Sequence, residues 1–172
     1  MKINITYATI LGTSQGLAED LEDELSATHD VSVTDIMHLA LDDLYDGSFY
    51  VFISSTTGRG ELPDTATDFV EDLNDAKPDL SALNFAIFGL GDQGSYGDNF
   101  CDAAGELYDC FSAQGATMVG LTATDDYDYS DSKALRDGKF CGLLCDEDNE
   151  YDKSEGRAND WVEQLKGEGV AF

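Results

Sequence analysis

The sequence predicts an α/β fold in which a five-stranded parallel sheet, in the order 2-1-3-4-5, is covered by helices on both faces. Short apolar segments of strand length alternate along the 172 residues with segments of helical periodicity. Right-handed crossovers allow few arrangements of such repeats, and this doubly wound order is the commonest for five strands. With 42% hydrophobic residues the chain can bury a sizeable core, and we expect residues 1–172 to form one domain.

The first half of the chain supplies three of the strands. Residues 2–7 and 49–54 are nearly continuous runs of β-forming residues, and 31–34 is a shorter run of the same kind. A helix is expected after the first strand and another after the third, with a weaker connection that contains Leu39, Leu41 and Leu44 between them. The apolar faces of the two helices are Leu17, Ala18, Leu21 and Leu25 in the first, and Phe69, Val70 and Leu73 in the second.

The second half completes the sheet and adds an irregular segment. Strands are expected at residues 84–90 and 116–121, with a helix between them and a last helix near 154–165. Residues 122–139 are too long and too polar for a simple connection, and 140–145 again resembles a strand. We expect this segment to leave the edge strand and return to it. The helical faces are Phe100, Ala104, Leu107, Tyr108 and Phe111 in one helix, and Ala158, Trp161, Val162 and Leu165 in the other.

The charge of the chain limits its partners. The 36 acidic and 9 basic residues give a net charge of −27, which opposes binding to nucleic acid and to anionic membrane surfaces. A charged partner is expected to present a basic surface. No apolar run is long enough to cross a membrane and no secretory signal is visible, so we expect a cytoplasmic protein.

Two other groups of residues invite a chemical interpretation. The cysteines Cys101, Cys110, Cys141 and Cys145 form no C-x-x-C pair, which favours reduced, buried thiols over a zinc or dithiol site. Residues 146–150 are acidic like a calcium loop, but Tyr151 and Arg157 stand where such a loop needs glycine and glutamate. We therefore expect a solvated acidic turn there and no metal site.

The candidate functional site lies in three loops rich in glycine and small polar residues. These loops follow the first, third and fourth strands, and the carboxyl ends of these strands meet at the switch point where open α/β sheets bind ligands. The first loop offers three hydroxyls, a glycine and a helix N-terminus, which suit a phosphate, although Thr13 or Ser14 could simply cap the helix. In the third loop, Tyr96 stands among glycines and suits stacking on a planar ligand.

Residues 91–103 read G-D-Q-G-S-Y-G-D-N-F-C-D-A and match the flavodoxin signature G-D-Q-x-x-Y-x-D-N-F. Residues 132–134, 138–143 and 146–149 match the long insertion and the return strand of long-chain flavodoxins. The chain resembles that family over essentially its whole length, whereas its second loop is more like that of diflavin-reductase FMN domains. The resemblance implies a flavodoxin-like three-layer α/β/α fold with a long-chain insertion in the last strand.

The resemblance also implies one non-covalent FMN, with the phosphate in residues 9–14 and the isoalloxazine against Tyr96. Asp92 and its neighbours would face the pyrimidine edge, and Leu62 could cover part of the other ring face. The cofactor-binding residues expected are Thr9, Ile10, Leu11, Gly12, Thr13, Ser14, Ser55, Thr56, Thr57, Gly58, Arg59, Gly60, Leu90, Gly91, Asp92, Tyr96, Asn99 and Phe100.

Two residues depart from the family pattern. Leu11 stands where a hydroxyl is usual, and the loss of one hydrogen bond weakens phosphate binding by about 1 kcal/mol. Thr57 stands where long-chain flavodoxins usually carry tryptophan, which removes a stacking partner worth about 1 kcal/mol.

The implied function is that of a low-potential one-electron carrier that cycles between FMN semiquinone and hydroquinone. Gly58 can turn its carbonyl toward the protonated flavin N5, and the candidate carboxylates Glu61, Asp64, Asp92 and Asp98 disfavour an anionic ring. The implied partner is a ferredoxin/flavodoxin-NADP reductase-type flavoprotein, together with other basic-surfaced redox proteins, and the carrier itself is not an enzyme and is expected to be a monomer. Two alternatives remain: an FMN-dependent oxidoreductase acting on a small substrate, and a flavin-free interaction module.

Overall fold

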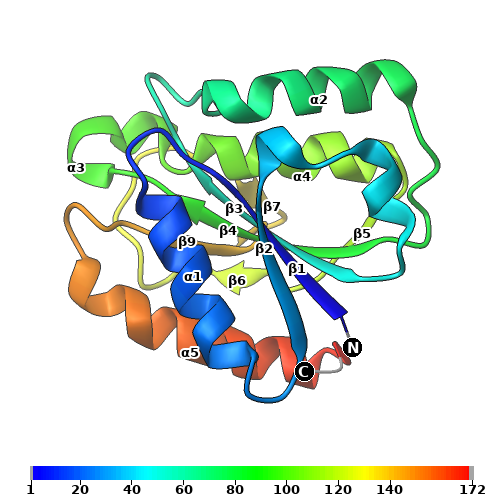
Figure 1. Ribbon diagram of the computed structural model, residues 1–172. Helices are drawn as coiled ribbons and strands as arrows, with labels where there is room; N and C mark the ends of the chain where they lie inside the picture. The colour runs from blue at the N-terminus through cyan, green and yellow to red at the C-terminus, as the bar shows by residue number, and fades with distance from the viewer. Residues whose placement is uncertain (1, 171–172) are drawn as a thin grey trace.

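A parallel β-sheet forms the centre of the molecule in the computed structural model, which describes residues 2–170 (Figure 1). Its strands are β2 (Asp30–Asp35), β1 (Lys2–Ala8), β3 (Phe49–Ser55), β4 (Asn84–Leu90) and β5 (Thr117–Met118), in that order across the sheet. The register pairs Ile5 of β1 with Val33 and with Val51 on its two neighbours. This is the order 2-1-3-4-5 predicted from the sequence, and the fold prediction is confirmed.

Helices cover both faces of the sheet. The helices α1 (Thr13–Leu25) and α5 (Tyr151–Gly167) lie below it in Figure 1, and α2 (Asp64–Ala76) and α4 (Asp102–Ala113) lie above it. Each helix buries an apolar face as its periodicity predicted, because the apolar residues repeat every three to four positions. The assignment of Phe100 to the face of α4 is wrong, since that helix begins at Asp102 and Phe100 lies in the preceding loop. Two separate core clusters result. Trp161 of α5 packs edge-on against Phe88 below the sheet, and Phe111 of α4 stacks on Phe52 above it.

The connections around these layers are short helices. Two 3-10 helices, η1 (Ile36–His38) and η2 (Leu41–Tyr45), form the weak connection expected after the second strand. The helix α3 (Gln93–Tyr96) and the 3-10 helix η3 (Gly97–Asn99) form the third glycine-rich loop. No helix in residues 2–170 has the length and apolar character needed to cross a membrane.

The fifth strand of the sheet is divided into two halves. Only Thr117–Met118 of the expected strand 116–121 pairs with β4, and it covers the start of that strand. The second half is β9 (Leu143–Cys145), which pairs with the end of β4 from Phe88 to Leu90. The insertion expected in the last strand is therefore present, and each side of it completes one half of the same sheet edge.

The insertion carries a small antiparallel sheet of its own. Its strands are β6 (Thr122–Ala123), β8 (Lys139–Phe140) and β7 (Leu135–Arg136), in that order. The expectation of one return strand over 140–145 is wrong, because Phe140 belongs to this small sheet and Leu143 to the main one. Gly142 stands between them at φ 124°, and its Cα lies so close to Ile87 of β4 that a side chain would meet the Ile87 carbonyl. Glycine at 142 therefore lets the chain pass from one sheet to the other.

The four cysteines are free and buried, as the sequence predicted. Burial raises the pKa of the Cys141 and Cys145 thiols to about 12, and that of Cys110 to about 11. Burial also raises the pKa of Cys101 well above its usual value. These thiols are protonated at neutral pH and act as packing groups rather than as nucleophiles.

Candidate functional site

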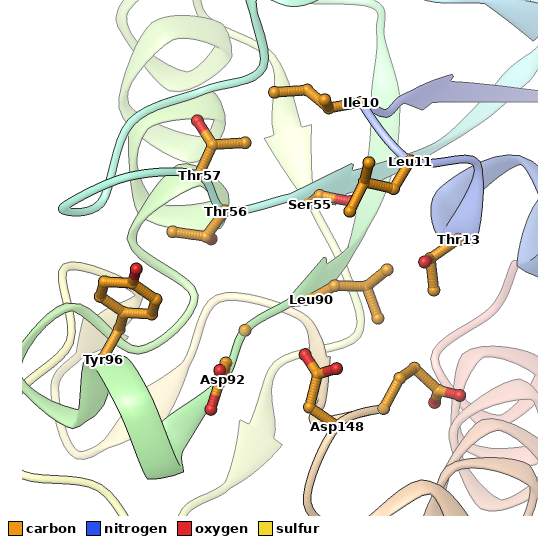
Figure 2. Close-up of a pocket in the computed structure, with 12 residues that line it drawn as sticks. Ile10, Leu11, Thr13, Ser55, Thr56, Thr57, Leu90, Asp92, Tyr96 and Asp148 are labelled. Carbon is orange, nitrogen blue, oxygen red and sulfur yellow. The ribbon is translucent and has the colours of Figure 1, made fainter.

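A cleft of about 370 Å³ opens at the carboxyl ends of β1, β3 and β4 (Figure 2). Its volume falls in the range of small-molecule and cofactor sites. The three predicted loops contribute most of its lining, and a fourth segment, after β9, contributes the rest. The lining residues are Ile10, Leu11, Thr13, Ser55, Thr56, Thr57, Leu90, Gly91, Asp92, Tyr96, Glu147 and Asp148.

The first loop brings the start of α1 to the cleft. Gly12 is the N-cap residue at φ 92°, and its N–H donates to Thr9 Oγ1 at 2.9 Å. The N-cap residue offers no side chain to cap α1, so the alternative in which Thr13 or Ser14 merely caps the helix is wrong. Ser14 is instead buried, with its Oγ 2.7 Å from Ser55 Oγ. This bond ties the first loop to the second and leaves first-turn N–H groups of α1 available to an anion.

The second loop enters the cleft with Ser55, Thr56 and Thr57 and then turns away from it. The Thr56 N–H donates to the Leu90 carbonyl at 2.9 Å, which ties this loop to the third. Gly58 and Arg59 lie exposed beyond the lining, and Gly60 is buried against Asp102. Leu62, the residue expected to cover one face of a planar ligand, is instead part of the core between the sheet and α2. That expectation is wrong, and Thr57 itself lines the cleft.

The third loop brings Asp92 and Tyr96 to the cleft. Asp92 is the N-cap residue of α3, and its carboxylate accepts the Ser95 N–H at 2.9 Å. Tyr96 ends this single turn of helix with 49% of its surface exposed, and it is the one aromatic residue that lines the cleft. Asn99 and Phe100 do not reach the cleft. Asn99 donates to Asp102 at 3.0 Å, and Phe100 is buried among aromatic rings of the insertion, so both anchor the loop.

The segment after β9 is the part of the site that the sequence analysis missed. Asp146 is fully buried, and its carboxylate accepts the N–H groups of Gln93 and Asn149, each at 2.9 Å. The Asn149 amide nitrogen also donates to Asp92 at 2.8 Å. The expected solvated turn is exposed at Asp148 and Asn149, but Asp146 is buried and connects α3 to the segment that presents Glu147 and Asp148. We call these hydrogen bonds of Asp146 the Asp146 brace. The sequence did contain a signal for this segment. A return strand that pairs in parallel with β4 must end at the same edge of the sheet as β4, so the residues after it lie next to the cleft.

The electrostatics of the cleft are dominated by carboxylates. Asp92, Glu147 and Asp148 line it, and no basic residue does. Partial burial acts to raise the pKa of Asp92, but hydrogen bonds from Asn149 and Ser95 outweigh it and hold that pKa below its usual value. Among residues 2–170 no group of three or more His, Cys, Asp or Glu side chains is arranged to hold a metal ion. The cleft thus combines an anion-binding helix end, an exposed ring and a negatively charged edge.

Ten of the eighteen predicted site residues line this cleft. The other eight support it from behind or lie beyond its edge, because the loops carry them past the strand ends. They are Thr9, Gly12, Ser14, Gly58, Arg59, Gly60, Asn99 and Phe100.

Comparison with known proteins gives one consistent result. The family model described as Flavodoxin matches residues 5–161. The chain is 40% identical to a flavodoxin of Nostoc sp. over 97% of its length and 96% of that protein, and 38% identical to flavodoxin 1 of Azotobacter vinelandii over 97% of each. Among solved structures, the flavodoxin of Fusobacterium nucleatum bound to flavin mononucleotide superimposes with a TM-score of 0.88 at 27% identity, over 97% of this chain and 98% of that one.

Proposed function

The chain belongs to the flavodoxin family, and on that premise we propose that it binds one FMN non-covalently in the cleft and carries single electrons between redox proteins. One observation carries the proposal. The cleft joins the uncapped N-terminus of α1 to an exposed tyrosine ring, and these two features suit the two ends of FMN.

The phosphate end of FMN would lie in the first loop. Thr13 lines the cleft there, and the first-turn N–H groups of α1 supply donors and a favourable dipole for a dianion. Because the loop contains no lysine or arginine, the phosphate would be held by hydrogen bonds alone. Leu11 is 93% exposed and contributes no hydroxyl, which makes this end of the site weaker than the usual pattern.

The ring end would lie between Tyr96, Leu90 and the backbone of residues 55–57. These residues form a largely apolar slot, and Asp92 with its neighbours would face the polar edge of the ring. Leu90 is buried at the base of the slot, and the aromatic face of Tyr96 provides a stacking surface. The residues present therefore fit a flat, partly polar ring system as well as a phosphate.

Bound FMN supplies the one-electron chemistry, and the protein selects which steps are accessible. Asp92, Glu147 and Asp148 place negative charge at the cleft, and the whole chain carries −27. That charge opposes a further negative charge on the ring and lowers the potential of the second one-electron step. With FMN bound, the Gly58 carbonyl would offer the ring a hydrogen-bond acceptor from the edge of the cleft, because a glycine peptide turns at low steric cost.

The acidic surface defines the proposed partners. A ferredoxin/flavodoxin-NADP reductase-type flavoprotein and other redox proteins with basic surfaces would meet it through fast, weak and salt-sensitive encounters. We propose that the carrier is a cytoplasmic monomer of one domain, because a shuttle must expose the edge of its cofactor to successive partners.

An anaerobic reductive titration followed by visible absorption tests this proposal. The protein is loaded with FMN and freed of excess before the titration. We expect retained yellow FMN that passes through a blue one-electron form before it bleaches. Retained FMN that bleaches in one step, or steady oxidation of NADPH by the protein alone, would contradict the carrier and favour an enzyme. A colourless protein after removal of excess FMN would contradict the cofactor assignment itself.

A further inference from the structure

A second hollow of the surface lies between η1 and α2. It is a groove of about 380 Å³, and it shares no lining residue with the cleft. The 3-10 helix η1, which follows β2 in Figure 1, packs against α2 along it. Because α2 begins directly after the second loop, a molecule held in this groove would lie beside the cleft without filling it.

The floor of the groove is apolar. Ile36 and Phe69 are buried at its base, and Leu39 is partly buried. Met37 is 59% exposed above them. The carboxylate of Asp35 accepts the Met37 N–H at 3.0 Å, which caps η1 and holds this methionine at the surface. A methionine side chain is flexible and polarizable, so it adapts its shape to an apolar group that packs on it.

The rim of the groove is acidic. Asp64, Asp68 and Asp72 follow one another at every fourth position of α2, which places them about 6 Å apart in one row along the helix. We call this row the Asp stripe. All three side chains are exposed, and none forms a hydrogen bond or an ion pair with any residue from 2 to 170. Asp64, one of the carboxylates expected near the cofactor, lines this groove and not the cleft.

The charge of the groove is uncompensated. None of its lining residues is basic, and like charges four residues apart on a helix repel one another. A cationic partner relieves that repulsion, whereas a second copy of this chain, with its own net charge of −27, adds to it. The occupant that fits must therefore bring positive charge to the rim and apolar groups to the floor.

We propose that this groove binds an amphipathic basic helix of a protein partner. Lysines or arginines four residues apart on such a helix repeat at about 6 Å, the same spacing as the Asp stripe. Apolar residues on the adjoining face of the helix pack on Met37 and Phe69, as in other helix-in-groove complexes. Binding in the groove requires no FMN, so it is independent of the proposed function.

Two synthetic peptides probe the groove. The first has about 18 residues, enough to form a helix in water, with leucines on one face and lysines four residues apart beside them. The second has the same composition in a shuffled order that forms no amphipathic face. The ¹⁵N NMR spectrum of the FMN-loaded protein is recorded as each peptide is added, which locates the binding site and gives the Kd.

The rim variant carries Asp64→Asn, Asp68→Asn and Asp72→Asn. It should bind the amphipathic peptide about tenfold more weakly than the wild type, since three exposed ion pairs are lost. In the wild type we expect the amide shifts to be centred on residues 36–39 and 64–72.

The matched control for the rim variant lies on α1. It carries Asp20→Asn, Asp23→Asn and Glu24→Gln, which remove three exposed carboxylates and give the same net charge. Its affinity for the peptide should fall by no more than about twofold, because distant surface charges are screened by salt.

Met37→Ser tests the floor of the groove. It should weaken binding about threefold, because apolar contact is lost, and the loss should be the same at low and at high salt. The loss in the rim variant should shrink as salt is raised, since it comes from charge.

Equal losses in the rim variant and in the α1 control would overturn the assignment, because the peptide would then follow the total charge only. Equal binding of the shuffled peptide, amide shifts centred outside the groove, or the absence of binding would overturn it as well. A wild type that retains no FMN would contradict the proposed function alone, since the same titration on that protein still reports on the groove.

Discussion

The second and third glycine-rich loops both line the cleft, but they are held in place differently. The third loop is tied through Gln93 and Asp92 to the Asp146 brace, whose carboxylate is fully buried. In the turn at the end of the second loop, residues 57–61, the peptide between Gly58 and Arg59 is held within residues 2–170 only by Glu61, an exposed side chain. Buried hydrogen bonds to a charged group are stronger than exposed ones, since water does not compete for the donors. The third loop is therefore held by a buried carboxylate, and we call it the fixed wall of the cleft. The second loop with its turn is held at one peptide by an exposed carboxylate, and we call it the adjustable wall.

Removal of the brace tests the fixed wall and has the largest expected effect. Asp146→Ala leaves the N–H groups of Gln93 and Asn149 without their acceptor, which should lower the free energy of unfolding by about 3 kcal/mol. FMN affinity should fall at least about tenfold, because Tyr96 loses the support of its helix. Denaturant unfolding and fluorescence titration measure the two effects.

The neighbouring Asp148→Ala is the control for stability. Asp148 is exposed and its side chain forms no hydrogen bond within residues 2–170, so its removal should change the unfolding free energy by less than about 0.5 kcal/mol. Equal losses in the two variants would mean that the brace contributes nothing beyond a charge.

The salt dependence of the unfolding free energy separates the buried carboxylate of Asp146 from the charges on the surface. The wild type should become more stable as KCl is raised from 0.1 to 1 M, because the Debye length falls from about 10 to about 3 Å and self-repulsion at net charge −27 is screened. The penalty of Asp146→Ala should stay constant to within about 0.5 kcal/mol, since a buried carboxylate is screened little. Chemical unfolding of both proteins across the salt series measures this, and a penalty that vanishes at high salt would place Asp146 among the surface charges.

Substitution of Gly58 tests the adjustable wall. Gly58→Ala should destabilise the protein by about 1 kcal/mol, because φ is positive and the new Cβ meets the Glu61 carboxylate. The double variant with Glu61→Ala should recover part of that loss, which a double-mutant cycle of unfolding free energies would register as coupling. Strict additivity of the two substitutions would argue against contact between Glu61 and Gly58.

The smallest effect is expected in the first loop. Leu11→Thr removes a side chain that is 93% exposed and adds a hydroxyl next to the proposed phosphate, so FMN affinity should rise about fivefold. Riboflavin, which has no phosphate, should bind equally well to both proteins. Fluorescence quenching titrations with the two ligands make the comparison, and an equal gain for riboflavin would remove the phosphate from this loop.

Sequence periodicity was sufficient for the sheet order and for the three loops. The expected strand 84–90 matches β4 as observed, because continuous apolar runs bounded by turn residues leave little choice. Local patterns could not show that the fifth strand is divided, since the pairing of Leu143 with Phe88 is decided by long-range register and by the close approach at Gly142. The Asp146 brace was missed for the same reason. From the sequence alone, Asp146 and its acidic neighbours are expected to face solvent. Only the pairing of β9 with β4 shows that they lie beside the third loop.

Amide hydrogen exchange of the FMN-loaded protein, measured by NMR in the oxidised and in the fully reduced state, tests the contrast most directly. The Gln93 N–H donates to buried Asp146 and the Arg59 N–H to exposed Glu61, so one sample reports both walls. We predict slow exchange at Gln93 in both states, and at Arg59 an exchange rate and chemical shift that change on reduction. An Arg59 amide that is unaffected by reduction, or a Gln93 amide that changes along with it, would contradict a fixed and an adjustable wall.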